Sequence, residues 1–188
     1  LTITDYVHVV TEGTASAGFK NVPLDAGAAV APAKVSAGGA VPKNDPVESL
    51  IDGIVTNGFG PIFANGVTDG AYKLDLGAEL SIAQVNTFSS GGANRARQNF
   101  VLYGSSSATD PGWNVSDATL FKPIIAVDTR QAERTEFEAT SIRRSNGKPL
   151  GSYRWLVWAV APVTGEVGGE NTAYQELQVV KAVAVPGT

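Results

Sequence analysis

Apolar and polar residues alternate along much of the chain, and this period of two predicts β-strands. In the clearest segment, Tyr72, Leu74 and Leu76 share one face and are predicted to point into a core. Lys73 and Asp75 lie between them and are predicted to face outward. Strand-like patterns bounded by turn residues recur in six further segments: 2–10, 81–89, 98–103, 134–142, 153–160 and 173–183. Because no helical period separates these strands, the predicted fold class is all-β, an antiparallel β-sandwich of the jelly-roll type.

Residues 1–45 differ in composition from the rest of the chain. After the strand-like residues 2–10, Gly, Ala and Pro dominate, which predicts turns around one or two short strands. Pro42 and Pro46 bracket the best candidate for a boundary. We therefore predict an N-terminal segment, 1–45, packed on the sandwich, and a jelly-roll domain, 46–188.

Composition restricts the chemistry that the chain can perform. Its 188 residues carry 14 Lys and Arg against 18 Asp and Glu, a net charge of −4. The absence of Cys excludes disulfides, thiolate metal sites and cysteine nucleophiles, and the single histidine, His8, argues against multi-histidine metal centres. With no basic stripe, a nucleic acid partner is not expected. No apolar run approaches the roughly 20 residues that span a bilayer, so membrane insertion is not expected either.

The chain begins at Leu1 and contains no methionine, which suggests that an N-terminal segment has been removed. A secretory signal is the commonest segment of this kind, so we expect a secreted or cell-surface protein.

Acidic residues cluster twice, but neither cluster favours catalysis. Glu136 and Glu138 follow Glu133 and are predicted to lie on one solvated strand face. Glu166 and Glu170 lie in a Gly-rich loop, which offers little desolvation to raise a catalytic pKa. The sequence therefore predicts a protein that is not an enzyme.

Several short motifs follow one another in an order that resembles a known family. They are Ser-Leu-Ile-Asp-Gly at 49–53, Tyr-Lys-Leu-Asp-Leu-Gly at 72–77, Ile-Ala-Gln-Val at 82–85, Asn-Phe-Val-Leu-Tyr-Gly-Ser at 99–105, Tyr-Arg-Trp-Leu-Val at 153–157 and Ala-Tyr-Gln-Glu-Leu-Gln-Val at 173–179. Over residues 46–183 the chain resembles the discoidin or coagulation factor 5/8 type C family, which includes galactose-binding-like carbohydrate-binding modules. The resemblance implies a β-sandwich jelly roll, in agreement with the strand pattern.

The resemblance also implies a structural calcium ion beside the Ile-Asp-Gly turn. Its oxygen ligands would be the carbonyls of Ser49, Ile54 and Gln175, the carboxylates of Asp52 and Glu176, and Asn57 through its carbonyl or side chain. Calcium takes six to eight oxygen ligands, which this set supplies. In the alternative interpretation, Asp52 only caps the turn and Glu176 faces solvent.

In this family, ligands bind to loops at one end of the sandwich, which correspond here to residues 58–65, 89–97 and 165–171. An aromatic ring can pack on the C–H face of a sugar, and Arg and Asn side chains can hydrogen-bond its hydroxyls. The candidate ligand-binding residues are Phe63, Asn65, Asn94, Arg95, Arg97 and Asn171. For Arg97 a structural ion pair is the alternative, whereas Phe59, Trp155 and Trp158 are interpreted as core residues.

Together, these expectations describe a non-catalytic, extracellular, lectin-like module that binds a glycan or polysaccharide and contains a structural calcium ion. Weak binding at a shallow site would gain from several copies in a homo-oligomer. The alternative is a structural subunit of an extracellular lattice, filament or capsid exterior. The low charge and the Ala- and Gly-rich residues 13–45 fit that alternative, and an edge strand at 2–10 could add to a neighbouring sheet.

Overall fold

The computed structural model describes residues 6–11, 27–91, 95–131, 136–165 and 168–183. Within these ranges the regular structure is β, apart from one 3-10 helix, η1 (Val47–Ile51). No helix among them is long and apolar enough to cross a membrane. The predicted all-β class is therefore confirmed.

Eleven strands form the described structure, and every pairing between them is antiparallel. They are β1 (Tyr6–Thr11), β2 (Gly27–Ala29), β3 (Lys34–Gly38), β4 (Lys43–Asn44), β5 (Pro61–Ile62), β6 (Ala71–Ser90), β7 (Asn99–Ser105), β8 (Lys122–Asp128), β9 (Phe137–Ile142), β10 (Gly151–Val160) and β11 (Ala173–Ala182). Strands β1, β2 and β3 pair with β9, β11 and β6, so part of the 1–45 segment belongs to the sheets. The boundary at residue 45 stays a prediction.

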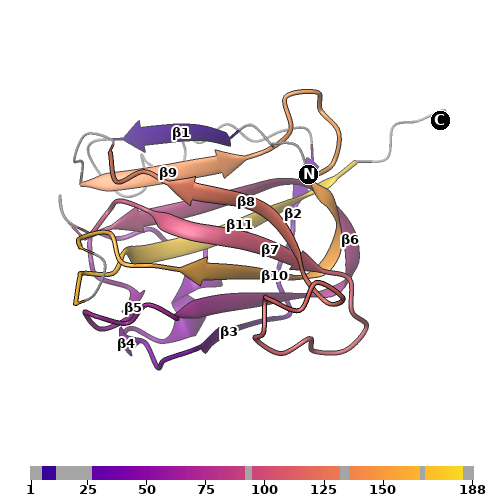
Figure 1. Ribbon diagram of the computed structural model, residues 1–188. Helices are drawn as coiled ribbons and strands as arrows, with labels where there is room; N and C mark the ends of the chain where they lie inside the picture. Colours follow the sequence, from indigo (N-terminus) through magenta and orange to yellow (C-terminus); the bar gives the residue numbers. More distant parts are fainter. Residues whose placement is uncertain (1–5, 12–26, 92–94, 132–135, 166–167, 184–188) are drawn as a thin grey trace.

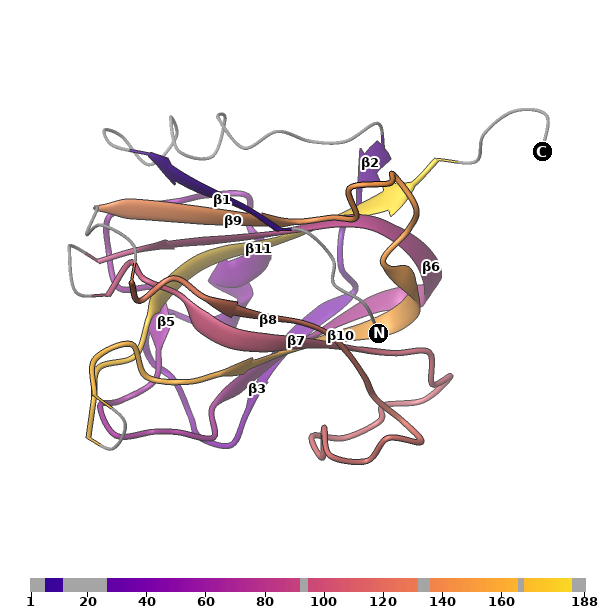
Figure 2. The same cartoon turned by 45° about the horizontal axis from the view of Figure 1, so that its top comes forward.

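The long strand β6 runs through both layers of the sandwich (Figures 1 and 2). Its first part pairs with β3 and β10, and β10 pairs in turn with β7 and β7 with β8. Its last part pairs with β9 and β11, which continue to β1 and β2. The sequence predicted two strands here, 72–76 and 81–89. A single strand can bend between the layers because Gly77 has a φ of +82°, a value that glycine adopts without strain.

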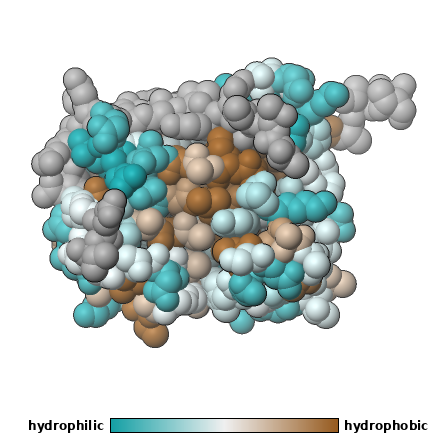
Figure 3. All heavy atoms as spheres, in the orientation of Figure 1, coloured by the Kyte–Doolittle hydropathy of each residue, from teal (hydrophilic) through white to brown (hydrophobic). Residues whose placement is uncertain are grey.

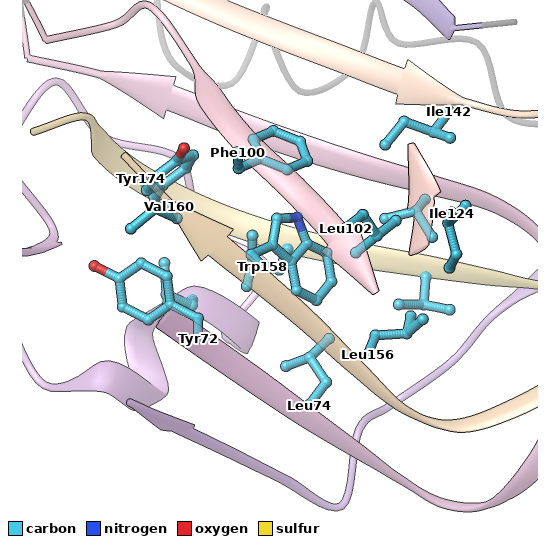
Figure 4. Close-up of a cluster of buried hydrophobic side chains, with 14 of the residues drawn as sticks. Tyr72, Leu74, Phe100, Leu102, Ile124, Ile142, Leu156, Trp158, Val160 and Tyr174 are labelled. Carbon is cyan, nitrogen blue, oxygen red and sulfur yellow. The ribbon is translucent and has the colours of Figure 1, made fainter. Parts of the chain in front are cut away.

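The core lies between the two layers, and Figure 4 shows its largest cluster. Tyr72 and Leu74 from β6 meet Trp158 from β10, as the alternation predicted for β6. The indole nitrogen of Trp158 donates a hydrogen bond to Thr87 Oγ1 at 3.0 Å, so its one polar group is satisfied inside the sandwich. Trp158 is buried in this cluster, which confirms its interpretation as a core residue. Trp155 is also buried, but on the opposite face of β10, where its indole nitrogen donates to the Ser107 carbonyl at 2.8 Å.

One layer consists of β3, the first part of β6, β10, β7 and β8. Its outer face is partly covered by the loop between β7 and β8. Lys73 points to this face, as predicted, but the loop buries it. Its Nζ donates to Asp110 Oδ1 at 2.5 Å and to the Gly112 carbonyl at 3.0 Å, and lies 4.2 Å from the centre of the Trp113 ring. These partners compensate the loss of hydration of the ammonium group. Away from this loop, hydrophobic residues gather over β7 and β8 (Figure 3).

Candidate ligand and metal sites

Backbone and side-chain hydrogen bonds hold three loops together at one end of the sandwich. The backbone NH of Gly66 donates to the Gly169 carbonyl at 2.9 Å, and that of Ala173 donates to the Arg95 carbonyl at 2.8 Å. The Asn171 side-chain amide donates to two carbonyls of the first loop, each at 3.0 Å. Segments more than 100 residues apart in sequence therefore share one surface.

Arg95 lies at the centre of this surface, with 18% of its side chain exposed. Its Nη1 donates to the Asn171 carbonyl at 3.2 Å. Its Nη2 donates to Asn65 Oδ1 at 3.1 Å and to Glu170 Oε1 at 3.2 Å. The guanidinium carbon lies 5.7 Å from the centre of the Phe59 ring. We call Phe59, Asn65, Arg95 and Glu170 the Arg95 cluster.

The Arg95 cluster combines an exposed ring with fixed polar groups. Phe59 is 48% exposed and Asn65 is exposed. An aromatic ring beside amide and guanidinium groups offers a stacking surface for C–H groups and hydrogen-bond partners for hydroxyls. The arrangement suits a small polar ligand that also has an apolar face.

The structure reverses the predicted burial of two phenylalanines. Phe63, predicted to bind ligand, is 2% exposed, and its ring centre lies 4.9 Å from that of Tyr72 in the core. Phe59, predicted to be buried, faces outward. The chain turns between them at Gly60, which has a φ of +58° and lies so close to the Tyr174 carbonyl that a Cβ would be 2.2 Å from its oxygen.

The remaining predicted ligand residues differ in accessibility. Asn65 and Arg95 lie together on the surface. Asn171 is buried and braces the first loop, so its side chain is a scaffold rather than a direct contact. Arg97 is half-buried, and its carbonyl accepts a hydrogen bond from the Thr172 hydroxyl. Asn94 lies outside the described residues.

Glu170 and Phe59 are the members of the Arg95 cluster that the ligand-residue prediction missed. Glu170 gave no separate signal, because an acidic residue in a Gly-rich loop is usually solvated. Its partner is Arg95, 75 positions away. Only the folded arrangement of the loops pairs the two side chains.

The second acidic cluster also departs from expectation. Glu138, predicted to be solvated, is buried and accepts a hydrogen bond from the Thr129 hydroxyl. The prediction failed because both faces of β9 are covered, whereas alternation implied one exposed face. Glu136 is exposed, and Glu133 and Glu166 lie outside the described residues.

A second site lies at the Ile-Asp-Gly turn, where two carboxylates approach each other. The backbone NH of Gly53 donates to Glu176 Oε2 at 3.1 Å, and that of Ile54 donates to Asp52 Oδ1 at 2.8 Å. Glu176 is only 5% exposed. Burial, opposed by the hydrogen bond from Gly53 and reinforced by the negative charge of Asp52, raises the pKa of Glu176 to about 8. The alternative in which Glu176 faces solvent is therefore wrong.

A pocket of about 230 Å³ opens beside this turn. Its walls are formed by Asp45, Pro46, Ser49, Asp52, Ile54, Thr56, Gly60 and Gln175. Gln175 has no partner in the β6–β11 register, which passes from Tyr174 to Glu176, so it forms a β-bulge. A bulge leaves the extra residue out of the ladder, which makes its carbonyl available to a ligand.

The predicted calcium ligands largely converge here. Ser49, Asp52, Ile54 and Gln175 line one pocket, and Glu176 is tied to the same turn. Asn57 is exposed and does not line the pocket, whereas its neighbour Thr56 does. Thr56 Oγ1 donates to Gln175 Oε1 at 2.9 Å.

The chemistry of these donors fits calcium. No group of three or more His, Cys, Asp or Glu side chains in the described part of the chain could hold a metal. A cation at this turn would therefore need carbonyl oxygens in addition to the two carboxylates. Oxygen donors of this mixed kind are what Ca²⁺ takes in proteins.

The bent strand β6, the two antiparallel layers and the loops at one end define an antiparallel β-sandwich of the jelly-roll type. The fold is similar to that of the CBM32 module of AlyQ, solved in complex with 4,5-unsaturated mannuronic acid (15% identity, TM-score 0.54, covering 82% of this chain and 99% of that one). It is also similar to the family 32 carbohydrate-binding module of NanJ from C. perfringens in complex with galactose (14% identity, TM-score 0.53, 81% and 98%). A third similar structure is a fucolectin from striped bass, Morone saxatilis (10% identity, TM-score 0.55, 82% and 48%).

No protein-family model matches the chain, and no curated protein matches it. The likeness to solved structures confirms the predicted fold of the discoidin and carbohydrate-binding-module type. The identities are low, so the likeness shows the fold alone and assigns no role to the Arg95 cluster or to the pocket beside the Ile-Asp-Gly turn.

Proposed function

We propose that the chain is a non-catalytic, extracellular carbohydrate-binding module that binds a glycan at the Arg95 cluster. The observation that carries this proposal is the exposed Phe59 ring beside a half-buried guanidinium and an exposed Asn65 amide. The ring would stack on the C–H face of a pyranose, while Asn65 and Arg95 would bind its hydroxyls. The fold supports the proposal, because similar structures were solved with sugars bound.

Calcium is the second part of the proposal. A Ca²⁺ ion held by Asp52, Glu176 and the carbonyls of Ser49, Ile54 and Gln175 would neutralise the two like-charged carboxylates and tie the turn to β11. Thr56, which lines the pocket in place of Asn57, would complete the site. The ion's role would be structural, since it belongs to the turn and not to the Arg95 cluster.

Affinity electrophoresis tests glycan binding. The protein is run through gels that each contain one soluble polysaccharide, with galactans, mannans, glucans and alginate in the panel, once with calcium and once with chelator. Retardation is expected in at least one gel. Phe59→Ala should remove most of it, because stacking on a ring contributes about 1 kcal/mol, roughly a fivefold change in affinity.

The matched control is Leu120→Ala, which truncates another exposed apolar side chain, in the loop that packs on Lys73. It should leave retardation unchanged. Unretarded migration in every gel under both conditions would refute the proposal. Discrete polymers in size-exclusion chromatography would then support the assembly-subunit alternative.

A further inference from the structure

The charges at the Arg95 cluster identify the class of glycan that it takes. On the basis of the proposed function, we propose that Glu170 is a specificity-determining residue that makes the site select neutral sugars over uronic acids. The observation is that the cation which would attract a sugar carboxylate already has a carboxylate partner within the protein.

The geometry of the pair supports this role. Glu170 Oε1 and Asn65 Oδ1 both accept from Nη2 of Arg95, and the Asn171 carbonyl accepts from Nη1. An arginine that is to bind a carboxylate presents two parallel N–H groups as a fork. Here Nη1 donates to the Asn171 carbonyl and Nη2 donates to both Asn65 and Glu170, so a uronate could form that paired contact only by displacing Glu170 or Asn65.

Glu170 is also held in place through its backbone. Its NH donates to Thr164 Oγ1 at 2.7 Å, and its carbonyl accepts from the NH of Val163 at 2.8 Å. The preceding residue, Gly169, lies so close to the Thr164 carbonyl that a Cβ there would be 1.5 Å from its oxygen. The loop therefore fixes the start of the side chain, and Glu170 cannot leave the site by a simple shift of the backbone.

These contacts determine whether a neutral sugar or a uronate binds more tightly. Arg95 and Glu170 together contribute no net charge, and a hydroxyl can donate to the Glu170 or Asn65 oxygens without a charge penalty. A uronate would add a second negative charge within a few ångströms of Glu170. Because Glu170 already offsets the attraction of Arg95, the uronate carboxylate would lose hydration without a net electrostatic gain. We expect this to weaken uronate binding roughly tenfold, which corresponds to about 1.4 kcal/mol.

Isothermal titration of the intact chain with matched sugar pairs tests the proposal. The probes are galactose and galacturonate, glucose and glucuronate, and mannose and mannuronate, each pair differing only in oxidation at C6. In the best-binding pair, the neutral sugar should bind roughly tenfold more tightly at low salt, and added salt should narrow the gap. Glu170→Gln should raise the affinity for the uronate relative to its neutral partner roughly tenfold, because the guanidinium of Arg95 then has no carboxylate partner and can attract the uronate.

Two further variants separate charge from shape and from folding. Glu170→Asp keeps the negative charge and should keep the preference for the neutral sugar, and Glu79→Gln, which removes an exposed carboxylate at a distant bend of β6, should behave like the wild type. A uronate that binds the wild type as tightly as its neutral partner, or a preference that survives Glu170→Gln, overturns the role of Glu170. Absence of binding by all six sugars overturns the selection proposed here, and unretarded migration in every polysaccharide gel overturns glycan binding itself.

Discussion

Glu170 and Glu176 lie six positions apart in sequence, yet their electrostatic surroundings are opposite. Glu170 is 31% exposed and has the guanidinium of Arg95 as its partner at 3.2 Å. Glu176 is 5% exposed, and the nearest acidic neighbour that acts on it is Asp52, which has the same charge. Its carboxylate accepts a hydrogen bond from a neutral backbone NH, that of Gly53.

The two sites differ in whether a negative charge has a positive partner. At the Arg95 cluster the protein supplies both charges, so the site has no need of an ion and is suited to a neutral ligand. Among the described residues that line the pocket at the Ile-Asp-Gly turn, the charged side chains are all acidic, and burial makes the negative charge of the adjacent Glu176 costly. A cation would satisfy the second site but has no place in the first.

The largest expected difference between Glu176 and Glu170 is in their effect on the pH dependence of stability in the metal-free protein. Because its pKa is raised from 4.5 to about 8, Glu176 binds a proton more tightly in the folded state than in the unfolded chain. Its stabilising contribution is therefore complete below about pH 4.5 and is lost as the pH rises through 8. Urea unfolding in chelator should show a free energy of unfolding that falls by up to about 1.4 kcal/mol per pH unit within this window.

Glu176→Gln should flatten this dependence, whereas Glu170→Gln should leave it intact. Asp75 acts in the opposite sense, because its hydrogen bonds with Arg154 lower its pKa. That contribution is lost as the pH falls below about 4, outside the window for Glu176. If the free energy of unfolding depends on pH equally steeply in the wild type and in Glu176→Gln, the two glutamates do not differ in this way.

The next largest expected difference between the two sites is in the effect of calcium on thermal unfolding at neutral pH, which should depend on the Ile-Asp-Gly turn. A ligand at a hundredfold excess over its Kd stabilises the folded state by about 2.7 kcal/mol, which corresponds to a rise in Tm of roughly 5–10 °C for a chain of this length. Asp52→Ala should abolish the rise in Tm, because it removes one of the two carboxylates. Asp69→Ala, at an exposed aspartate that does not line the pocket, should retain it. Equal Tm values with calcium and with chelator in the wild type would contradict the proposed calcium site.

Sequence patterns predicted the strands well, because alternation is a local property of the chain. They did not predict that β6 is continuous, since Gly77 reads as an end to one strand although its positive φ allows a bend. They gave no prediction for β8, because Lys122–Asp128 has consecutive apolar residues and a proline instead of a clear alternation.

The sites were harder to predict than the strands, because they depend on contacts between distant loops. The resemblance to a known family was sufficient to bring Asp52 and Glu176 to one turn. It was not sufficient to choose between Phe59 and Phe63, since the close approach of Gly60 to Tyr174 decides which ring is buried. No local pattern contains that contact.

Loss of the guanidinium should separate ligand binding from calcium binding. Arg95→Gln removes the charged donor, and hydrogen bonds to charged groups contribute about 1.5–3 kcal/mol, so glycan affinity should fall roughly ten- to a hundredfold. The calcium-dependent rise in Tm should remain, because Arg95 has no contact with the Ile-Asp-Gly turn in the part of the chain that the structure describes. Titration calorimetry and a thermal melt on the same sample measure both effects. A loss of the calcium response in Arg95→Gln would mean that the two sites are coupled.

The smallest expected effect is on stability at the Arg95 cluster. Glu170 and Arg95 form an ion pair close to the surface, where such pairs contribute about 0–1 kcal/mol to folding. Glu170→Gln should therefore lower the free energy of unfolding by no more than about 1 kcal/mol at neutral pH, in calcium or in chelator. Urea titrations under the two conditions measure this change. A larger loss would mean that Glu170 stabilises the loops themselves, and its negative charge would then serve folding instead of ligand selectivity.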